Sequence, residues 1–150
     1  RGLYTWWQRS FVHPSMLAFD APTREECCAE RNRSNIPQQA LVLLNDPTYV
    51  EAARAFATKI LSECKGSPED RIQWAFQCAL QRKATPEELS TLQALFQKHL
   101  IAYKTDVKSA ETLLQTGQAP TPKEFEAVEL AAWTHIARVL LNLHETITRA

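Results

Sequence analysis

The sequence lacks several features that would assign it to a functional class. It contains no run of about 18 consecutive apolar residues, so it predicts no membrane span. Three glycines among 150 residues are too few and too scattered to build a glycine-rich phosphate loop. The scarcity of glycine also disfavours the many tight turns of a β-sandwich or barrel, and the composition therefore favours an all-helical fold.

Excess charge is also absent. The sequence has 17 Lys and Arg residues against 17 Asp and Glu residues. It therefore lacks the basic surface expected of a nucleic-acid binder, and it has no overall attraction to anionic membranes. The chain begins at Arg1 with neither an initiator Met nor a signal peptide. We expect residues 1–150 to be a single helical domain, either the C-terminal fragment of a larger multidomain protein or a processed product.

The four cysteines are not spaced as cofactor ligands. Cys27, Cys28, Cys64 and Cys78 form neither a C-x-x-C motif nor the C-x-x-C-H site that attaches haem. Cys64 and Cys78 are expected at different heights on two antiparallel helices, which disfavours a disulfide between them. We therefore expect four free thiols that act as small apolar fillers, and no cofactor in this chain. The alternative is a bridge from Cys27 or Cys28 to a later cysteine.

Several residues in the middle of the chain indicate where helices begin and end. Pro37 and Pro47 each suit the first position of a helix, and Asp46 is placed to cap the second of these helices. Apolar residues then recur at helical spacing up to Gly66, which we expect to end the helix in a left-handed conformation. Before Pro37 we expect only short helices, one within residues 1–13 and one capped by Thr23.

Three later helices share one starting pattern. Ser67, Thr85 and Thr121 are each followed by a proline and, three residues on, by an acidic residue, which predicts a capping box at each start. The second of these helices has no breaker before Leu114, and the apolar pattern of the third continues to Ile147. The sequence therefore predicts an irregular bundle of about five to seven helices, with two long C-terminal helices packed antiparallel.

The histidines do not have the spacing of a metal site. His135 and His144 are nine residues apart on one expected helix, so they point to opposite faces. His99 lies on the preceding helix beside Tyr103, and His13 lies in a turn. No H-E-x-x-H motif is present. We therefore expect histidines that are exposed or hydrogen-bonded rather than metal ligands.

Residues 19–54 hold most of the unusual chemistry. The candidate residues combine two acids, three arginines and an asparagine near three proline-containing turns: Asp20, Arg24, Arg31, Arg33, Asn35 and Asp46. We interpret them as structural, with acids accepting backbone N–H groups and guanidinium groups binding carboxylates or terminal carbonyls. The alternative is catalytic, with Asp20 as a base held by a guanidinium. No recognisable set of nucleophile, base and orienting group accompanies it.

Aromatic residues gather near the start of the chain, at Tyr4, Trp6, Trp7 and Phe11. Such a cluster suits a platform on which sugars stack. The more ordinary interpretation is a plug against the helical bundle, or an interface with a neighbouring domain. Carbohydrate binding through these aromatic residues is therefore kept as an alternative.

One long segment carries a family resemblance. Residues 19–54 read FDAPTREECCAERNRSNIPQQALVLLNDPTYVEAAR, and this segment resembles a planctomycete-specific domain family of unknown function (domain of unknown function 1553). Residues 1–9 and the segment AWTHIARVLLNLHETITR, at 132–149, are also similar to that family. The chain departs from the family pattern at several positions, among them Glu26, Cys28, Ile36 and His144.

The resemblance implies an all-helical domain that closes large exported proteins, which often carry a cytochrome-c-type domain. It implies a periplasmic or cell-surface location and carries no activity or cofactor. We therefore expect a non-enzymatic module that packs on other domains of its parent protein or on an exported partner. One alternative is a contribution to a hydrolase-like or redox site, with Asp20 and Arg31 lining the pocket beside His13 and Trp6 or Trp7. The other is carbohydrate binding.

Overall fold

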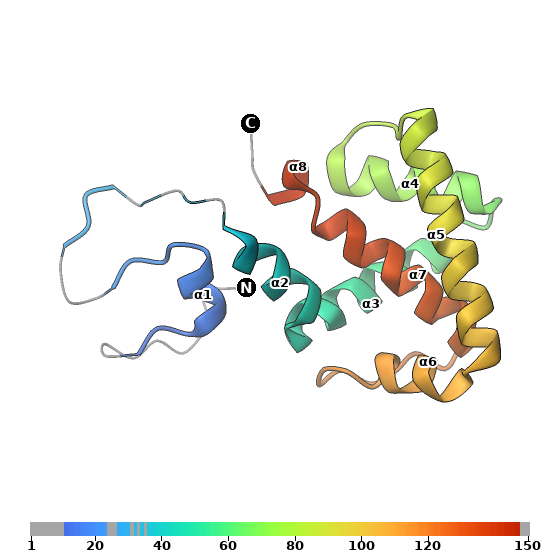
Figure 1. The fold of residues 1–150 in the computed structure, drawn as a ribbon. Helices are drawn as coiled ribbons and strands as arrows, with labels where there is room; N and C mark the ends of the chain where they lie inside the picture. The colour runs from blue at the N-terminus through green and yellow to red at the C-terminus, as the bar shows by residue number, and fades with distance from the viewer. Residues whose placement is uncertain (1–10, 24–26, 31, 33, 35, 148–150) are drawn as a thin grey trace. The chain divides into compact units, whose positions relative to one another are not determined.

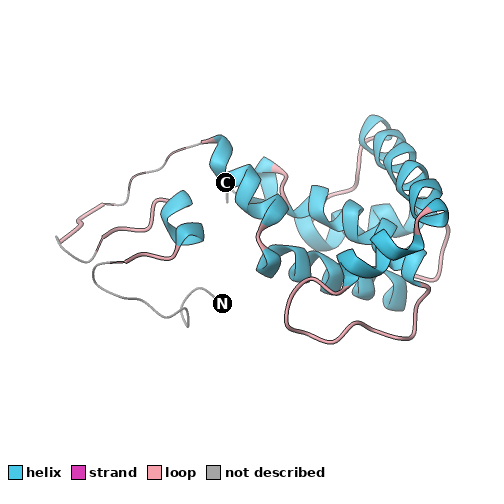
Figure 2. Ribbon diagram, turned by 60° about the horizontal axis from the view of Figure 1, so that its bottom comes forward, coloured by secondary structure: helices cyan, strands magenta, loops and turns pink. Residues whose placement is uncertain are grey.

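The computed structural model describes residues 11–23, 27–30, 32, 34 and 36–147 (Figure 1). The chain divides into two compact units, Arg1–Val42 and Leu43–Ala150, and each is described by itself. The single domain expected for residues 1–150 stays a prediction. The described residues contain no strand (Figure 2), which confirms the all-helical prediction. Their eight helices are α1 (Pro14–Ala18), α2 (Pro37–Asn45), α3 (Pro47–Glu63), α4 (Pro68–Leu80), α5 (Pro86–Thr105), α6 (Val107–Leu114), α7 (Ala127–Leu141) and α8 (His144–Ile147).

The first unit contains α1 and the start of α2. The turn at His13, expected to end a helix, begins one instead, because Pro14 suits the first helical position. Beyond α1, Asp20 has a φ of 54°, in the left-handed region that Asp tolerates better than most residues. Its carboxylate accepts hydrogen bonds from the backbone N–H and the hydroxyl of Ser34, both at 2.7 Å. The helices expected within residues 1–13 and after Thr23 fall largely outside the described residues.

Helix α3 begins as the sequence predicts. Asp46 is the N-cap, and its carboxylate accepts a hydrogen bond from the backbone N–H of Thr48 at 2.9 Å. The end of α3 differs from the prediction, because the capping residue is the extended Cys64. Gly66 is not left-handed. A side chain there would collide with Asp70, since a Cβ atom would lie 2.7 Å from its carboxylate oxygen.

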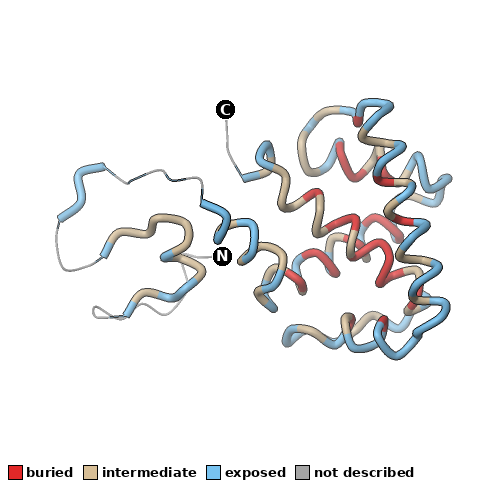
Figure 3. Tube along the Cα trace, in the orientation of Figure 1, coloured by how far each residue is buried: buried red, intermediate tan, exposed pale blue. Residues whose placement is uncertain are grey.

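The core of the second unit is organised around α7. This helix contacts α3, α4, α5, α6 and α8, and buried residues run along it and along α3 (Figure 3). The indole of Trp133 is fully buried and packs on Phe96 of α5, with ring centroids 4.7 Å apart. Nearly all of the circumference of α7 is apolar, and the helix is therefore enclosed by other helices.

Two of the three predicted capping boxes form. The Ser67 hydroxyl accepts a hydrogen bond from the Asp70 N–H at 3.2 Å, and the Asp70 carboxylate accepts one from the Ser67 N–H at 2.9 Å. Thr85 and Glu88 exchange the same pair of bonds at 3.3 and 2.8 Å. Helices α4 and α5 therefore begin where local sequence alone places them.

Replacing either capping hydroxyl, as Ser67→Ala or Thr85→Ala, is expected to lower the free energy of unfolding by about 1 kcal/mol. Urea denaturation of the full chain measures this loss. Ser90→Ala is the matched control, because the Ser90 hydroxyl only donates to the Glu87 carbonyl within α5. The control should stay within about 0.5 kcal/mol of the wild type. An equal loss in all three variants would show that the caps contribute nothing specific.

The third predicted capping box is wrong. The Thr121 hydroxyl donates to the Leu114 carbonyl at 2.9 Å and so closes the end of α6 instead of opening a helix. Helix α7 begins at Ala127, and its N-cap Glu126 makes no side-chain capping bond. The connection from α6 to α7 is therefore longer than the sequence predicts.

The long helix predicted from Pro86 to Leu114 is also wrong, because it breaks at Asp106. This residue is non-helical, with φ −129° and ψ 83°, and it caps α6. Its carboxylate accepts hydrogen bonds from the Ser109 N–H at 3.2 Å and the Ser109 hydroxyl at 2.6 Å. Asp is a strong N-cap and a poor interior helix residue. The pair of two long antiparallel C-terminal helices is therefore not confirmed.

The last predicted helix is divided as well. It ends at Leu141, and His144 begins the short α8, so His135 and His144 lie on different helices. Arg82 holds α8 in place, since its guanidinium binds Glu145 at 2.8 Å and Glu88 at 2.7 Å. The hydrogen bonds from Arg82 and from the Thr85 backbone hold the pKa of Glu88 at about 2.

All four cysteines are free thiols. Cys27, Cys28 and Cys78 are exposed, and Cys64 is partly buried. The interpretation as apolar fillers is therefore wrong for the three exposed residues, because they lie outside the packed core. No helix among the described residues combines the length and the apolar character that crossing a membrane requires.

Candidate functional site

Two of the candidate residues within residues 19–54 are described, and both bind backbone groups. Asp20 accepts from the Ser34 N–H, and Asp46 accepts from the Thr48 N–H. These bonds are of the kind expected from a structural role. The other candidates lie outside the described residues, and their roles stay predictions: Arg24, Arg31, Arg33, Asn35, Tyr4, Trp6 and Trp7.

The last residue of this stretch, Arg54, has a role that the sequence did not reveal. It lies on α3 and is only 3% exposed. Its guanidinium donates to the carbonyl of Leu114, at the end of α6, and to the carbonyl of Ala119 at 2.7 Å. The carbonyl groups at a helix C-terminus carry partial negative charge, so a cation is favoured there.

Glu51 lies one turn before Arg54 on α3 and binds N–H groups of the connection between α6 and α7. Its carboxylate accepts hydrogen bonds from Gln118 and Ala119, and these bonds lower the pKa of Glu51. Gly117 allows the approach, because it has a φ of 103° and a Cβ atom there would collide with Glu51. Glu51 and Arg54 together form the α3 clamp, which fixes the connection between α6 and α7.

A second polar cluster, the histidine pair, lies between α5 and α7. The rings of His99 and His135 are stacked with centroids 3.9 Å apart and planes inclined by 4°. The hydroxyl of Tyr103 lies 2.6 Å from Nε2 of His135. Arg138, on the next turn of α7, faces Nδ1 of His135 at 3.4 Å and donates to the carbonyl of Leu44 in α2. The cluster therefore connects three helices.

The surroundings fix the tautomer of His135. A guanidinium only donates hydrogen bonds, so the nitrogen that faces Arg138 must present its lone pair. Nδ1 is then unprotonated, and Nε2 carries the hydrogen and donates it to the Tyr103 oxygen. In this arrangement His135 is neutral, and both of its ring nitrogens have partners.

Electrostatics also favour the neutral form of both histidines. Burial, followed by the nearby His99 and Arg138, lowers the pKa of His135 to about 4. Burial, followed by Lys98 and Arg138, lowers the pKa of His99 below its usual value. Burial also raises the pKa of Tyr103. At neutral pH the cluster is therefore an uncharged stack beside the cations Arg138 and Lys98.

The pairing of His99 with His135 was not predicted from the sequence. Spacing placed His99 beside Tyr103 and related His135 only to His144. His99 and His135 are far apart in the chain and meet only because α5 packs on α7. Tyr103 follows His99 by four residues, and Arg138 follows His135 by three. This spacing is the local signal that each pair shares one helix face.

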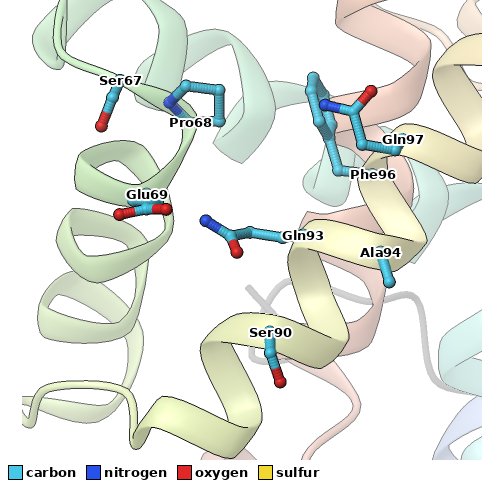
Figure 4. A pocket seen from close by; sticks show the side chains of 8 residues that line it. All are labelled: Ser67, Pro68, Glu69, Ser90, Gln93, Ala94, Phe96 and Gln97. Carbon is cyan, nitrogen blue, oxygen red and sulfur yellow. The ribbon is translucent and has the colours of Figure 1, made fainter.

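The described residues also line an open surface groove of about 600 Å³ between the start of α4 and the middle of α5 (Figure 4). Gln93 points across it toward Glu69. Ser67, at its edge, is already engaged in the capping box of α4. None of the candidate residues lines this groove, and no His or Cys is among its eight lining residues: Ser67, Pro68, Glu69, Ser90, Gln93, Ala94, Phe96 and Gln97.

Comparison with known proteins gives the family of the chain. A family model named PSD1, described as a protein of unknown function (DUF1553), matches residues 1–96. The chain belongs to this family. No curated protein and no solved structure matches the chain.

The PSD1 match ends at Phe96 in α5. It includes residues 19–54 and therefore the α3 clamp residues Glu51 and Arg54. It does not include the histidine pair, nor the segment 132–149 that is similar to the family in sequence. The α3 clamp thus connects the matched part of this PSD1 chain to a loop beyond the match.

Metal binding by this PSD1 chain has no support among the described residues. Across residues 11–147, outside the gaps given above, no three His, Cys, Asp or Glu side chains are grouped to hold a metal ion. The stacking of His99 on His135 is also unsuited to a shared ion, because the lone pairs of stacked rings run parallel instead of converging. The cluster is therefore a packed polar contact between helices.

Proposed function

We propose that this chain is a non-enzymatic helical module of an exported multidomain protein, and that it packs on other domains of that protein. The observation that carries this proposal is the exposure of large apolar side chains in the part that matches the PSD1 family. Phe11 is 61% exposed, Leu17 60% and Leu41 56%. Helices α1 and α2 contain no buried residue.

The polar residues of the same part support this proposal. Asp20, Asp46, Glu51 and Arg54 all bind backbone groups of the chain itself. Residues that hold turns and helix ends contribute to the fold. Exposed apolar side chains are unfavourable in water, and burying them in an interface lowers the free energy. The polar side chains within residues 19–54 would then hold the fold that presents this apolar surface to another domain.

The location and context follow from the family resemblance. We propose a planctomycete protein that acts in the periplasm or at the cell surface and carries a cytochrome-c-type domain elsewhere in its chain. Any haem would be held by that domain, because this sequence has no C-x-x-C-H site. An exported partner, carbohydrate binding through Tyr4, Trp6 and Trp7, and a part in a hydrolase-like or redox site stay alternatives.

A photo-cross-linking amino acid placed at position 41 of the full-length protein tests the proposal. Leu41 is exposed on α2 within the family match, so we expect cross-links to another domain of the same polypeptide, identified by mass spectrometry. Position 101 is the matched control, because Ile101 is 64% exposed on α5 beyond the match. It should give several-fold less intramolecular product. Absence of cross-links from position 41, or cross-links only to other proteins, would refute packing on the parent.

A further inference from the structure

The histidine pair lies where three helices meet, and its contact with Arg138 needs an uncharged ring of His135. His99 of α5 stacks on His135 of α7 at 3.9 Å, and Tyr103 of α5 binds Nε2 of His135 at 2.6 Å. Arg138 of α7 faces Nδ1 of His135 and also donates to the Leu44 carbonyl of α2. The contact with Arg138 depends on the ring of His135 keeping a lone pair at Nδ1.

The groups around the pair oppose a positive charge from several directions. Lys98 on α5 and Arg138 on α7 are the charged groups that act on the rings. Tyr103 supplies a neutral phenol, and α2 supplies the backbone carbonyl that Arg138 binds. A proton on either imidazole would therefore add a third cation next to Lys98 and Arg138, and protonation of both would place two cations face to face.

We propose that the stacked pair of His99 and His135 is an acid-sensitive latch, which holds α5 and the end of α2 against α7 at neutral pH and opens more readily as the pH falls below about 6.5. When His135 takes up a proton at Nδ1, its N–H is directed at the guanidinium N–H of Arg138. That contact changes from a hydrogen bond to a repulsion. Arg138 must then move away, and its bond to Leu44 is lost with it.

The pH window follows from the direction of the shifts. The pKa values of both histidines are lowered in the folded chain, His135 to about 4, so the unfolded chain binds more protons as the pH falls below about 6.5. The stability that the neutral pair contributes is fully present above about pH 6.5. It is lost progressively as the pH falls toward 4. The lowered pKa of Glu88, about 2, affects stability mainly below that range.

Urea denaturation at pH 7.5 and pH 5.5 tests the latch in the full chain. From pH 7.5 to pH 5.5 the unfolding equilibrium constant should rise in both proteins. The factor of increase is expected to be about ten times larger for the wild type than for His135→Gln, which has no titrating ring at this position. His144→Gln is the matched control, because His144 is exposed on the neighbouring α8. It should behave as the wild type. Equal pH dependence in the wild type and in His135→Gln would overturn the proposal.

A second measurement needs only the wild type and holds if a variant fails to fold. NMR titration of the imidazole resonances in the folded chain should show His135 protonating well below pH 6, and amide exchange in α5 should accelerate on acidification once corrected for its intrinsic pH dependence. A His135 resonance that titrates at about pH 6.5 or above, or α5 amides with unchanged protection, would overturn the latch. Both tests concern the stability of the chain itself and are independent of the partner proposed above.

Discussion

The Trp133→Ala variant is expected to lose about 4 kcal/mol of unfolding free energy. Trp133 is the largest fully buried side chain of α7, packs on Phe96, and has the Arg71 guanidinium 5.9 Å from its ring centroid. Removing the indole leaves a cavity between α5 and α7 that the surrounding helices cannot fully close. Urea denaturation with circular dichroism measures the loss.

The matched control for this prediction is Trp74→Ala. Trp74 lies at the edge of the core on α4, where it is only partly buried and has Lys59 5.9 Å from its ring centroid. Because it already contacts solvent, its removal is expected to cost about 1 to 2 kcal/mol. Equal losses for the two tryptophans would show that α7 is not the centre of the core.

The Arg54→Met variant is expected to lose about 3 kcal/mol of unfolding free energy. Methionine keeps the apolar stem of the buried side chain, but it removes the charged donors to the Leu114 and Ala119 carbonyls. The Ala119 carbonyl then loses this bond, and Leu114 keeps only the bond from Thr121. Urea denaturation measures the stability, and amide exchange of Gln118 and Ala119 reports the loop.

Lys59→Met on the same helix is the control for the α3 clamp. The Lys59 side chain is 55% exposed. It makes a surface ion pair with Glu63 and a distant contact with the Trp74 ring, so its loss should change stability by less than about 0.5 kcal/mol. If Arg54→Met were equally harmless and the exchange of the loop amides unchanged, the clamp would have no structural role.

Local signals predicted much of the fold. Asp46 with Pro47, and the capping boxes at Ser67 and Thr85, begin helices as expected, because a cap and the residues that it satisfies lie within three positions of each other. The same reasoning gave a structural role for Asp20, although its partner Ser34 is 14 residues away and not in its own turn.

Competition between local signals explains the errors in the helices. Thr121 has the sequence of a cap, but its hydroxyl donates to the carbonyl of Leu114 at the end of α6 instead. The segment around Asp106 has a helical apolar pattern, yet Asp106 makes its own cap with Ser109 and divides the helix. Which signal prevails depends on how α6 packs against α7, and one sequence does not reveal that packing.

The most informative contacts are long-range and were not predictable from spacing. Arg54 reaches a carbonyl 65 positions away, and the ring of His135 stacks on a helix distant in the chain. Arginine and histidine on an amphipathic helix are usually solvated, so nothing local distinguishes these two. Their roles depend on tertiary packing, which brings a buried cation to unpaired carbonyls and a neutral imidazole to a phenol.

The central claim is that the polar residues of residues 19–54 serve the fold and leave the apolar surface to a partner. The unfolding free energy of the double variant Asp46→Ala with Arg54→Met tests this claim most directly. Both residues lie at α3, separated by two turns, so their losses of about 1 and about 3 kcal/mol should add to about 4 kcal/mol. A double variant that unfolds at the same urea concentration as the wild type would contradict the account.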